Sequence, residues 1–226
     1  GSRRRFLKQA VGAGTAVAMP NILTRPLFGA PSANGTIQVA LIGCGGIGNY
    51  HRSNLARIED ARIIAVADAF RSRREKFAAE LNAQYKETNL VKAYGDFREI
   101  LARPDIDAVF IGAHDNWHTP MAIAAMKAGK DVYCQKPLAL DFLLTKLLRQ
   151  TALESKRVFQ FGTQFRSSAR YRQMVRIVRN GYIGKLEKMH VWSRGVAWDV
   201  ASYHVKPYGS TAEIPVPEDL DFDAWM

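Results

Sequence analysis

Short apolar runs alternate with longer amphipathic stretches along the chain after Thr36. Each run is bounded by glycine or polar turn residues, as buried strands are, and each stretch between two runs has the length and spacing of a helix. Strands separated by helices pair in parallel through right-handed crossovers. The pattern therefore predicts an α/β fold with a doubly wound parallel sheet, whose strands are expected at 37–42, 62–67, 107–112, 131–134 and 158–161.

The stretches between these strands carry helix signals. A charged helix beginning at Ser72 should bury Phe77, Ala78 and Leu81, which share one side. Asp96 is a predicted N-cap for a short helix. A leucine-rich helix precedes the last strand, and we expect it to face the sheet with Leu140, Leu143, Leu144, Leu147 and Leu148. The remaining helices are expected at 47–58, 97–102 and 119–128.

The pattern changes after Gly162. A helix with an apolar stripe is expected there, and the arginines opposite the stripe are interpreted as a solvated face, because aromatic residues are not interleaved with them. Weak alternation over 185–192 predicts a half-exposed strand. A single strand cannot form a domain, so we expect residues 163–226 to be the beginning of an incomplete α+β second domain, with an extended end and exposed apolar residues at Trp225 and Met226.

The first predicted strand runs directly into a turn of sequence G-x-G-x-x-G at residues 43–48. In such a turn the first glycine allows the tight bend, the second leaves room for a pyrophosphate, and the third lets the helix pack closely on the strand. The N-terminus of that helix attracts phosphates. Asp68 ends the next strand 20 residues after Gly48, the spacing at which an acid binds an adenosine ribose. We therefore predict dinucleotide binding by Gly43, Gly45, Gly46, Ile47, Gly48 and Asp68.

Composition is that of a globular protein, with 47% hydrophobic and 23% charged residues among 226. The net charge of +11 falls to +6 without residues 1–33. Such a moderate excess suits anionic nucleotides, and no nucleic-acid partner is expected. Cys44 and Cys134 are interpreted as reduced apolar residues. The five histidines lack metal-ligand spacing, so no metal site is expected.

Residues 1–33 form a separate segment. Ser2 to Lys8 reads S-R-R-R-F-L-K and resembles the twin-arginine export motif S-R-R-x-F-L-K. The apolar stretch 10–19 is too short to span a bilayer, which takes about 20 residues, and small residues follow at 29–33. We interpret 1–33 as a twin-arginine signal peptide, which implies the twin-arginine export machinery as a partner and a periplasmic or exported location in a bacterium. The alternative is a basic amphipathic tail.

From Thr36 onwards the chain resembles the glucose-fructose oxidoreductase / inositol dehydrogenase / MocA family. Besides the glycine turn, the resemblance rests on Trp117-His118, on the segment 128–138, which reads A-G-K-D-V-Y-C-Q-K-P-L, and on the turn 181–186, which reads G-Y-I-G-K-L. It implies an NAD(P)-binding Rossmann domain over 36–162, a following domain for substrate binding and oligomerisation, and a homo-oligomer. Asp68 favours NAD, because a carboxylate repels a 2′-phosphate, whereas Arg71 and Arg73 keep NADP possible.

The resemblance also implies roles for single residues. Lys136 matches the lysine of the E-K-P segment, which contacts the nicotinamide and takes part in proton transfer. Asn116 and His118 match a cofactor-binding loop, and Arg166 matches a position near the active-site mouth, where a surface arginine is the alternative. Two departures are Gln135, in place of glutamate, and Ala113-His114, in place of Thr-Pro. The second-domain aspartate and histidine that complete the family's active site are expected beyond Met226.

Three functions remain open from the sequence. The first is an NAD(P)-dependent oxidoreductase that moves a hydride between its nicotinamide and a CH–OH carbon of a sugar or polyol. The second is a glycoside hydrolase of the same family that retains its NAD. The third is a non-catalytic nucleotide-binding protein. The fragment by itself is expected to lack activity, because part of the implied active site lies outside it.

Overall fold

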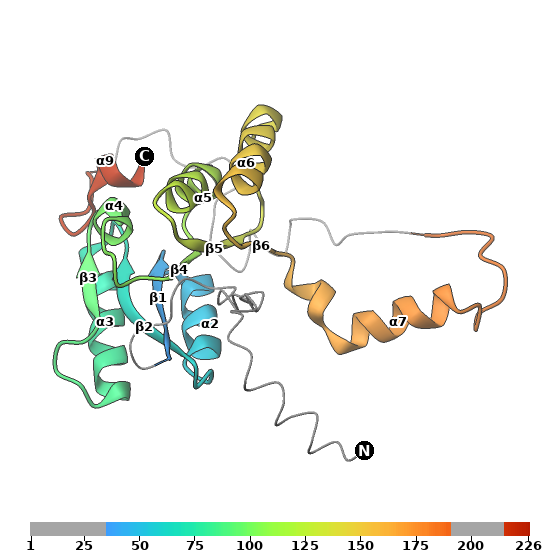
Figure 1. The fold of residues 1–226 in the computed structure, drawn as a ribbon, viewed down its shortest axis with the longest axis horizontal. Helices are drawn as coiled ribbons and strands as arrows, with labels where there is room; N and C mark the ends of the chain where they lie inside the picture. Colours follow the sequence, from blue (N-terminus) through green and yellow to red (C-terminus); the bar gives the residue numbers. More distant parts are fainter. Residues whose placement is uncertain (1–34, 191–214) are drawn as a thin grey trace, which may run out of the picture.

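The computed structural model describes residues 35–190 and 215–226, and the described part contains one six-stranded parallel sheet (Figure 1). Its strand order is β3-β2-β1-β4-β5-β6, so the chain is wound outwards in both directions from the centre. This confirms the predicted doubly wound sheet. The strands are β1 (Ile37–Ile42), β2 (Ala61–Ala67), β3 (Lys92–Tyr94), β4 (Ala108–Ile111), β5 (Asp131–Gln135) and β6 (Phe159–Gly162).

Helices connect these strands close to where the sequence predicts them. Asp96 caps its helix as expected, because its side chain accepts a hydrogen bond from the backbone N–H of Arg98 at 2.8 Å. Phe77, Ala78 and Leu81 are buried, also as expected. The helices between strands are α2 (Gly46–Leu55), α3 (Arg71–Tyr85), α4 (Phe97–Leu101), α5 (His118–Lys127) and α6 (Phe142–Ser155), with a 3₁₀ turn, η1 (Asp115–Trp117), before α5.

Each face of the sheet has its own apolar core. On one face, side chains of β1, β2, β4 and β5 pack against α4, α5 and α6, and on the other, side chains of β1 and β2 pack against α2 and α3. Strands buried on both faces have continuous apolar sequences, and this is why these strands could be predicted from the sequence. β3 was not predicted, because its three residues are exposed or half-buried and carry no apolar run.

The central strands end at the same level of the sheet. Ile42 at the end of β1 lies opposite Ala67 of β2 and Ile111 of β4. The chain therefore leaves the sheet at Gly43, Asp68 and Gly112 side by side. The strand order reverses between β1 and β4, and ligands of doubly wound folds bind at this switch point.

The leucine-rich helix α6 corrects one expectation. Of the five leucines expected to face the sheet, only Leu148 is buried, at 2% exposure. Leu140 lies before the helix and is exposed, as are Leu143, Leu144 and Leu147. The sheet ends with the four-residue strand β6, and α6 packs mainly beside α5 (Figure 1), so the sheet edge is too narrow to cover the whole stripe.

Beyond β6 the structure follows the sequence only in part. A 3₁₀ turn, η2 (Gln164–Ser167), leads to the predicted helix, α7 (Ala169–Arg179), whose apolar stripe and arginines are all exposed. No strand forms over 185–190, which pair with none of the strands in the described residues, and residues 191 and 192 lie outside the described part. The predicted signal peptide, 1–33, lies outside it as well.

The last described segment, 215–226, returns to the sheet and ends in the short helix α9 (Phe222–Trp225). Leu220 forms an antiparallel bridge with Phe70, just after β2. Trp225 is half-buried, which corrects the expectation of an exposed apolar end, although Met226 is exposed as predicted. The sequence gives no sign of this docking, because it depends on contacts with residues about 150 positions earlier.

Helices in the described ranges, 35–190 and 215–226, all fall short of the length and apolar content that a transmembrane helix needs.

The contrast between buried Leu148 and exposed Leu143 on α6 leads to a prediction about stability. Leu148→Ala should lower the free energy of unfolding by about 2–5 kcal/mol, because it opens a cavity between α6 and the sheet. Leu143→Ala removes the same atoms from a side chain that is 70% exposed and should change stability by less than about 0.5 kcal/mol. Urea denaturation followed by circular dichroism measures both. Equal losses in the two variants would contradict this packing of α6.

Candidate functional site

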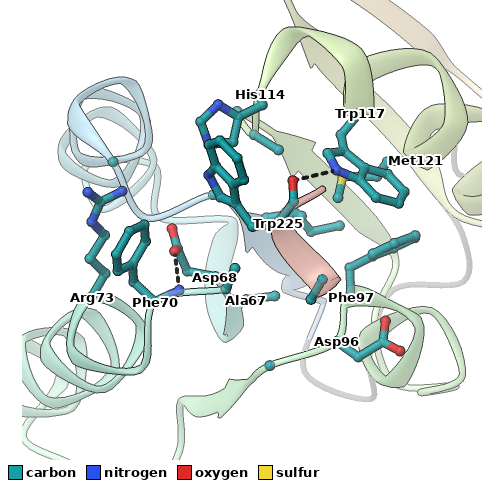
Figure 2. Close-up of a pocket in the computed structure, with 18 of the residues that line it drawn as sticks. Ala67, Asp68, Phe70, Arg73, Asp96, Phe97, His114, Trp117, Met121 and Trp225 are labelled. Atoms are coloured by element: carbon teal, nitrogen blue, oxygen red, sulfur yellow. Dashed lines mark hydrogen bonds between the residues drawn. The ribbon is translucent and has the colours of Figure 1, made fainter. Parts of the chain in front are cut away.

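A cavity of about 210 Å³ lies along the edge where β1, β2 and β4 end (Figure 2). Its walls come from the glycine turn, from the loops after β2, β3 and β4, and from the end of the chain. Gly43, Gly45, Gly46, Ile47 and Asp68, all predicted cofactor residues, line it. The other residues used below that line it are Phe70, Arg73, Gly112, His114, Trp117 and Trp225.

The glycines of the turn do two different things. Gly43 has a φ of +100°, and a Cβ there would lie 2.4 Å from the carbonyl oxygen of Gly112. A Cβ on Gly48 would lie 2.0 Å from the carbonyl oxygen of Gly43. These two positions therefore permit backbone to pack on backbone. At Gly45 and Gly46 a Cβ would meet nothing within 4 Å, so their lack of side chains leaves space for a ligand.

The N-terminus of α2 lies beside the space left by Gly45 and Gly46. Gly45 is its N-cap and offers no side-chain cap, and the first turn holds no acidic residue. The first N–H groups of this ten-residue helix have no intrahelical acceptors, and together with the helix dipole they attract an anion. The turn thus combines an open cradle with a positive helix end.

Asp68 has a structural task that the sequence did not reveal. One carboxylate oxygen accepts a hydrogen bond from the backbone N–H of Cys44 at 2.7 Å, and the other accepts one from Phe70 at 2.8 Å. The carboxylate therefore fastens the glycine turn to the end of β2. Each carboxylate oxygen has two acceptor positions, so Asp68 retains capacity for a ligand hydroxyl.

Arginines surround the loop after β2. Arg74 donates to the carbonyl oxygen of Asp68 at 2.9 Å and so supports the loop. Arg73 lines the cavity with its guanidinium 4.0 Å from the centre of the Phe70 ring. Of Arg71 and Arg73, which the sequence could not separate, Arg73 is the one beside the cavity.

His118 connects two loops beneath the site. It is 1% exposed, with Nδ1 2.6 Å from the carbonyl oxygen of Pro137 and Nε2 3.1 Å from that of Ala113. Thr119 adds a hydroxyl bond to the carbonyl oxygen of Leu138 at 2.7 Å. His118 therefore supports the loop that carries Lys136 rather than lining the cavity.

Lys136 is exposed directly after β5, at the same edge of the sheet as the glycine turn but outside the cavity. The last residue of β5, Gln135, precedes it, and the Gln135 side-chain oxygen accepts a hydrogen bond from the backbone N–H of Lys136 at 2.9 Å. Gln135 is 2% exposed, and its Nε2 has no hydrogen-bond partner among the described residues. The residue that replaces the family's glutamate thus holds the backbone of Lys136 in place.

Two other predicted residues lie apart from the cavity. Asn116 is exposed in η1, and Arg166 is exposed in η2, after β6. Both follow strands at the carboxyl edge, on the same side of the sheet as Lys136.

Lys130 belongs to the same segment, 128–138, as Lys136, but it precedes β5 and therefore lies at the opposite end of the strands. Its ammonium is buried and donates to the carbonyl oxygens of Ile106, at 2.8 Å, and of Arg103. Burial lowers its pKa from the usual lysine value. Lys130 therefore provides a hydrogen-bond donor for two backbone carbonyl groups of the loop before β4, and it lies outside the site.

The remaining reactive groups near the site are held inactive by burial. Burial lowers the pKa of His51, whose ring packs on Tyr133 and Phe110, so the imidazole is neutral near pH 7. Cys44 and Cys134 are free and buried. Burial, with Asp68 adding to it for Cys44, raises the pKa of both thiols, that of Cys134 to about 12. No group of metal-ligating side chains occurs within the described residues.

Comparison with known proteins agrees with this geometry. The oxidoreductase family with an NAD-binding Rossmann fold, Gfo/Idh/MocA, matches residues 37–163. A myo-inositol 2-dehydrogenase of Thermotoga maritima is 30% identical over 161 residues, which are 71% of this chain and 46% of that protein. An inositol 2-dehydrogenase of Rhizobium meliloti is 27% identical over 159 residues, 70% of this chain and 46% of its own.

Solved structures agree as well. A scyllo-inositol dehydrogenase of Lactobacillus casei, crystallised with NAD(H) and scyllo-inositol, has a TM-score of 0.60 at 28% identity and covers 66% of this chain and 43% of its own. A myo-inositol 2-dehydrogenase of Lactobacillus plantarum has a TM-score of 0.60 at 31% identity, covering 67% and 43%. The chain spans less than half the length of these relatives. With the family pattern covering more than half of it, the chain belongs to the Gfo/Idh/MocA family of NAD-binding oxidoreductases.

Proposed function

We propose that this chain is the cofactor-binding part of an NAD-dependent dehydrogenase that acts on a CH–OH group of a polyol or sugar. The observation that carries the proposal is the cradle at the switch point, where Gly45 and Gly46 leave open space beside the N-terminus of α2 and beside Asp68. These features fit a dinucleotide. Inositol dehydrogenases among the relatives favour a cyclic polyol as the substrate class.

Each part of the dinucleotide has a matching group. The pyrophosphate would lie on the open glycines, where N–H groups and the helix dipole meet it. The adenosine ribose would place its hydroxyls at Asp68, which keeps free acceptor positions. A 2′-phosphate would be repelled by that carboxylate, so NAD is the preferred cofactor, and Arg73 is the group that would moderate this preference.

The nicotinamide would lie further along the same edge, towards β5. When bound, the cofactor supplies the hydride chemistry. Lys136, directly after β5, would donate a hydrogen bond to the substrate hydroxyl, stabilise the developing alkoxide and move its proton. Gln135 and His118 hold the loop that carries this lysine.

The location and the assembly of the protein are further parts of the proposal. Arg3 and Arg4, in the leader with the twin-arginine pattern, support export of the folded protein by the twin-arginine machinery to the periplasm. The apolar stripe of α7, which is exposed in the described part, supports homo-oligomer formation.

Binding of NAD is tested at Gly45. Its φ of −80° is open to any residue, so Gly45→Val should fold normally and place methyl groups where the pyrophosphate lies. We expect the Kd for NAD, measured by calorimetry, to rise by more than about 100-fold. Gly48→Ala is the contrasting variant and should unfold at lower temperature, since its Cβ meets the Gly43 backbone. Unchanged NAD affinity in Gly45→Val would rule out this cradle.

The role of Lys136 is tested by turnover in the full-length protein. Lys136→Ala should bind NAD nearly normally and lose roughly 10²–10⁴-fold in kcat on a polyol substrate. Lys136→Arg should recover little, because a guanidinium keeps its proton near neutral pH. Lys127→Ala, at an exposed lysine on α5, is the control. Retained turnover in Lys136→Ala would show a structural lysine, and turnover without net NADH formation would favour an NAD-retaining hydrolase.

Export is tested by replacing both leader arginines with lysine. The pair keeps its charge but loses the guanidinium groups, so the protein should remain in the cytoplasm. Cell fractionation with immunodetection measures the distribution. Equal amounts in the periplasm with and without the replacements would count against the twin-arginine route.

A further inference from the structure

The end of the chain forms part of the wall of the nucleotide cavity. In the segment 217–226, the backbone carbonyl of Asp219 accepts the N–H of Arg71 at 2.8 Å, and the N–H of Asp221 donates to the carbonyl of Ala69 at 3.1 Å. A hydroxyl bond from Ser72 to the Asp219 carboxylate adds to this pairing. The partners of the segment, 69–72, directly follow Asp68, so it is attached to the loop that carries the predicted ribose ligand.

A second attachment lies across the cavity. The indole N–H of Trp117 donates to the backbone carbonyl of Trp225 at 3.1 Å, and the rings of Trp225 and His114 form a T-shaped pair with 5.0 Å between centroids. Both partners belong to the loop after β4. The segment therefore reaches from the β2 side of the cavity to the β4 side.

The side chain of Trp225 is directed into the site. Figure 2 shows its indole between His114 on one side and Phe70 and Asp68 on the other. The short helix α9 fixes this direction, since the Asp221 side chain caps it by accepting the N–H of Ala224 at 3.0 Å. The ring is half-buried and lines the cavity beside Asp68.

The position of Asp68 decides which part of a dinucleotide meets this ring. If Asp68 binds the adenosine ribose, the base attached to that ribose lies within one sugar's width of the carboxylate. A flat aromatic ring there offers a surface on which a purine stacks. The cavity of about 210 Å³ is lined mainly by apolar atoms, which suits a purine base beside the indole, while the open glycines of the same cavity are left for the pyrophosphate.

We propose that Trp225 is a cofactor-binding residue that stacks on the adenine of the dinucleotide, with 217–226 holding it in place. This inference rests on the proposed NAD binding and adds a contact outside the Rossmann domain. It implies that the adenosine half of the cofactor is enclosed by residues from both ends of the described chain. Loss of one base–aromatic stack corresponds to roughly a 5- to 150-fold rise in Kd.

Calorimetric titration of the full-length protein with NADH, ADP-ribose and nicotinamide mononucleotide tests the proposal. Trp225→Ala should weaken NADH and ADP-ribose by roughly 5- to 150-fold and leave the mononucleotide unchanged, because only the first two ligands carry adenine. Trp225→Phe should retain most of the affinity. Asp219→Ala leaves the ring intact but weakens its attachment, and it should shift the same two ligands by a smaller factor. Tyr182→Ala, at an aromatic residue that is 78% exposed, is the control and should change nothing.

The outcomes separate this proposal from the one beneath it. Unchanged affinity for NADH and ADP-ribose in both Trp225→Ala and Asp219→Ala would overturn the stacking role while leaving NAD binding intact. Tighter binding in Trp225→Ala would also overturn it, by showing that the indole takes the place of the base. Failure of the unaltered protein to bind NADH at all would instead remove the proposed function.

Discussion

The site depends on close backbone packing at the centre of the sheet. Gly43 approaches Gly112, which directly follows β4, and Gly48 approaches Gly43 so closely that even a methyl group would overlap an oxygen atom. This packing draws the first turn of α2 down to the end of β1 and directs its N–H groups outwards along the sheet edge. The cradle, the place of Asp68 beside it and the reach of the cavity towards β4 all follow from it.

Around this centre the edge of the sheet is divided between two kinds of support. On the β2 side, carboxylate and guanidinium groups of Asp68 and Arg74 tie down loops that line the cavity. On the β5 side, the neutral side chains of Gln135 and Thr119, together with the His118 ring, hold the loop that exposes Lys136. The first arrangement fixes loops that line the cavity, and the second fixes the loop that exposes Lys136.

Local pattern was enough to predict most of the fold and part of the site. Apolar runs locate strands buried on both faces, and the glycine spacing locates the turn, because both depend on residues adjacent in sequence. β3 was not predicted, because its pairing with β2, and not an apolar sequence, makes it a strand. The burial of the α6 leucines was predicted wrongly, because their apolar stripe is wider than the part of the sheet that α6 covers. The tie from Asp68 to Cys44 and the docking of Trp225 join distant residues, and no local pattern encodes such contacts.

The two cysteines are placed where the fold protects them from oxidation. Cys44 belongs to the core on one face of the sheet and Cys134 to the core on the other, so the sheet itself separates them. Burial raises the pKa of both thiols, so each is protonated near neutral pH. Oxidants attack thiolates, so burial and protonation of both thiols protect the folded domain from cross-linking and from sulfenic acid formation. Chemical resistance here comes from the geometry of the sheet, without a disulfide and without the loss of either cysteine.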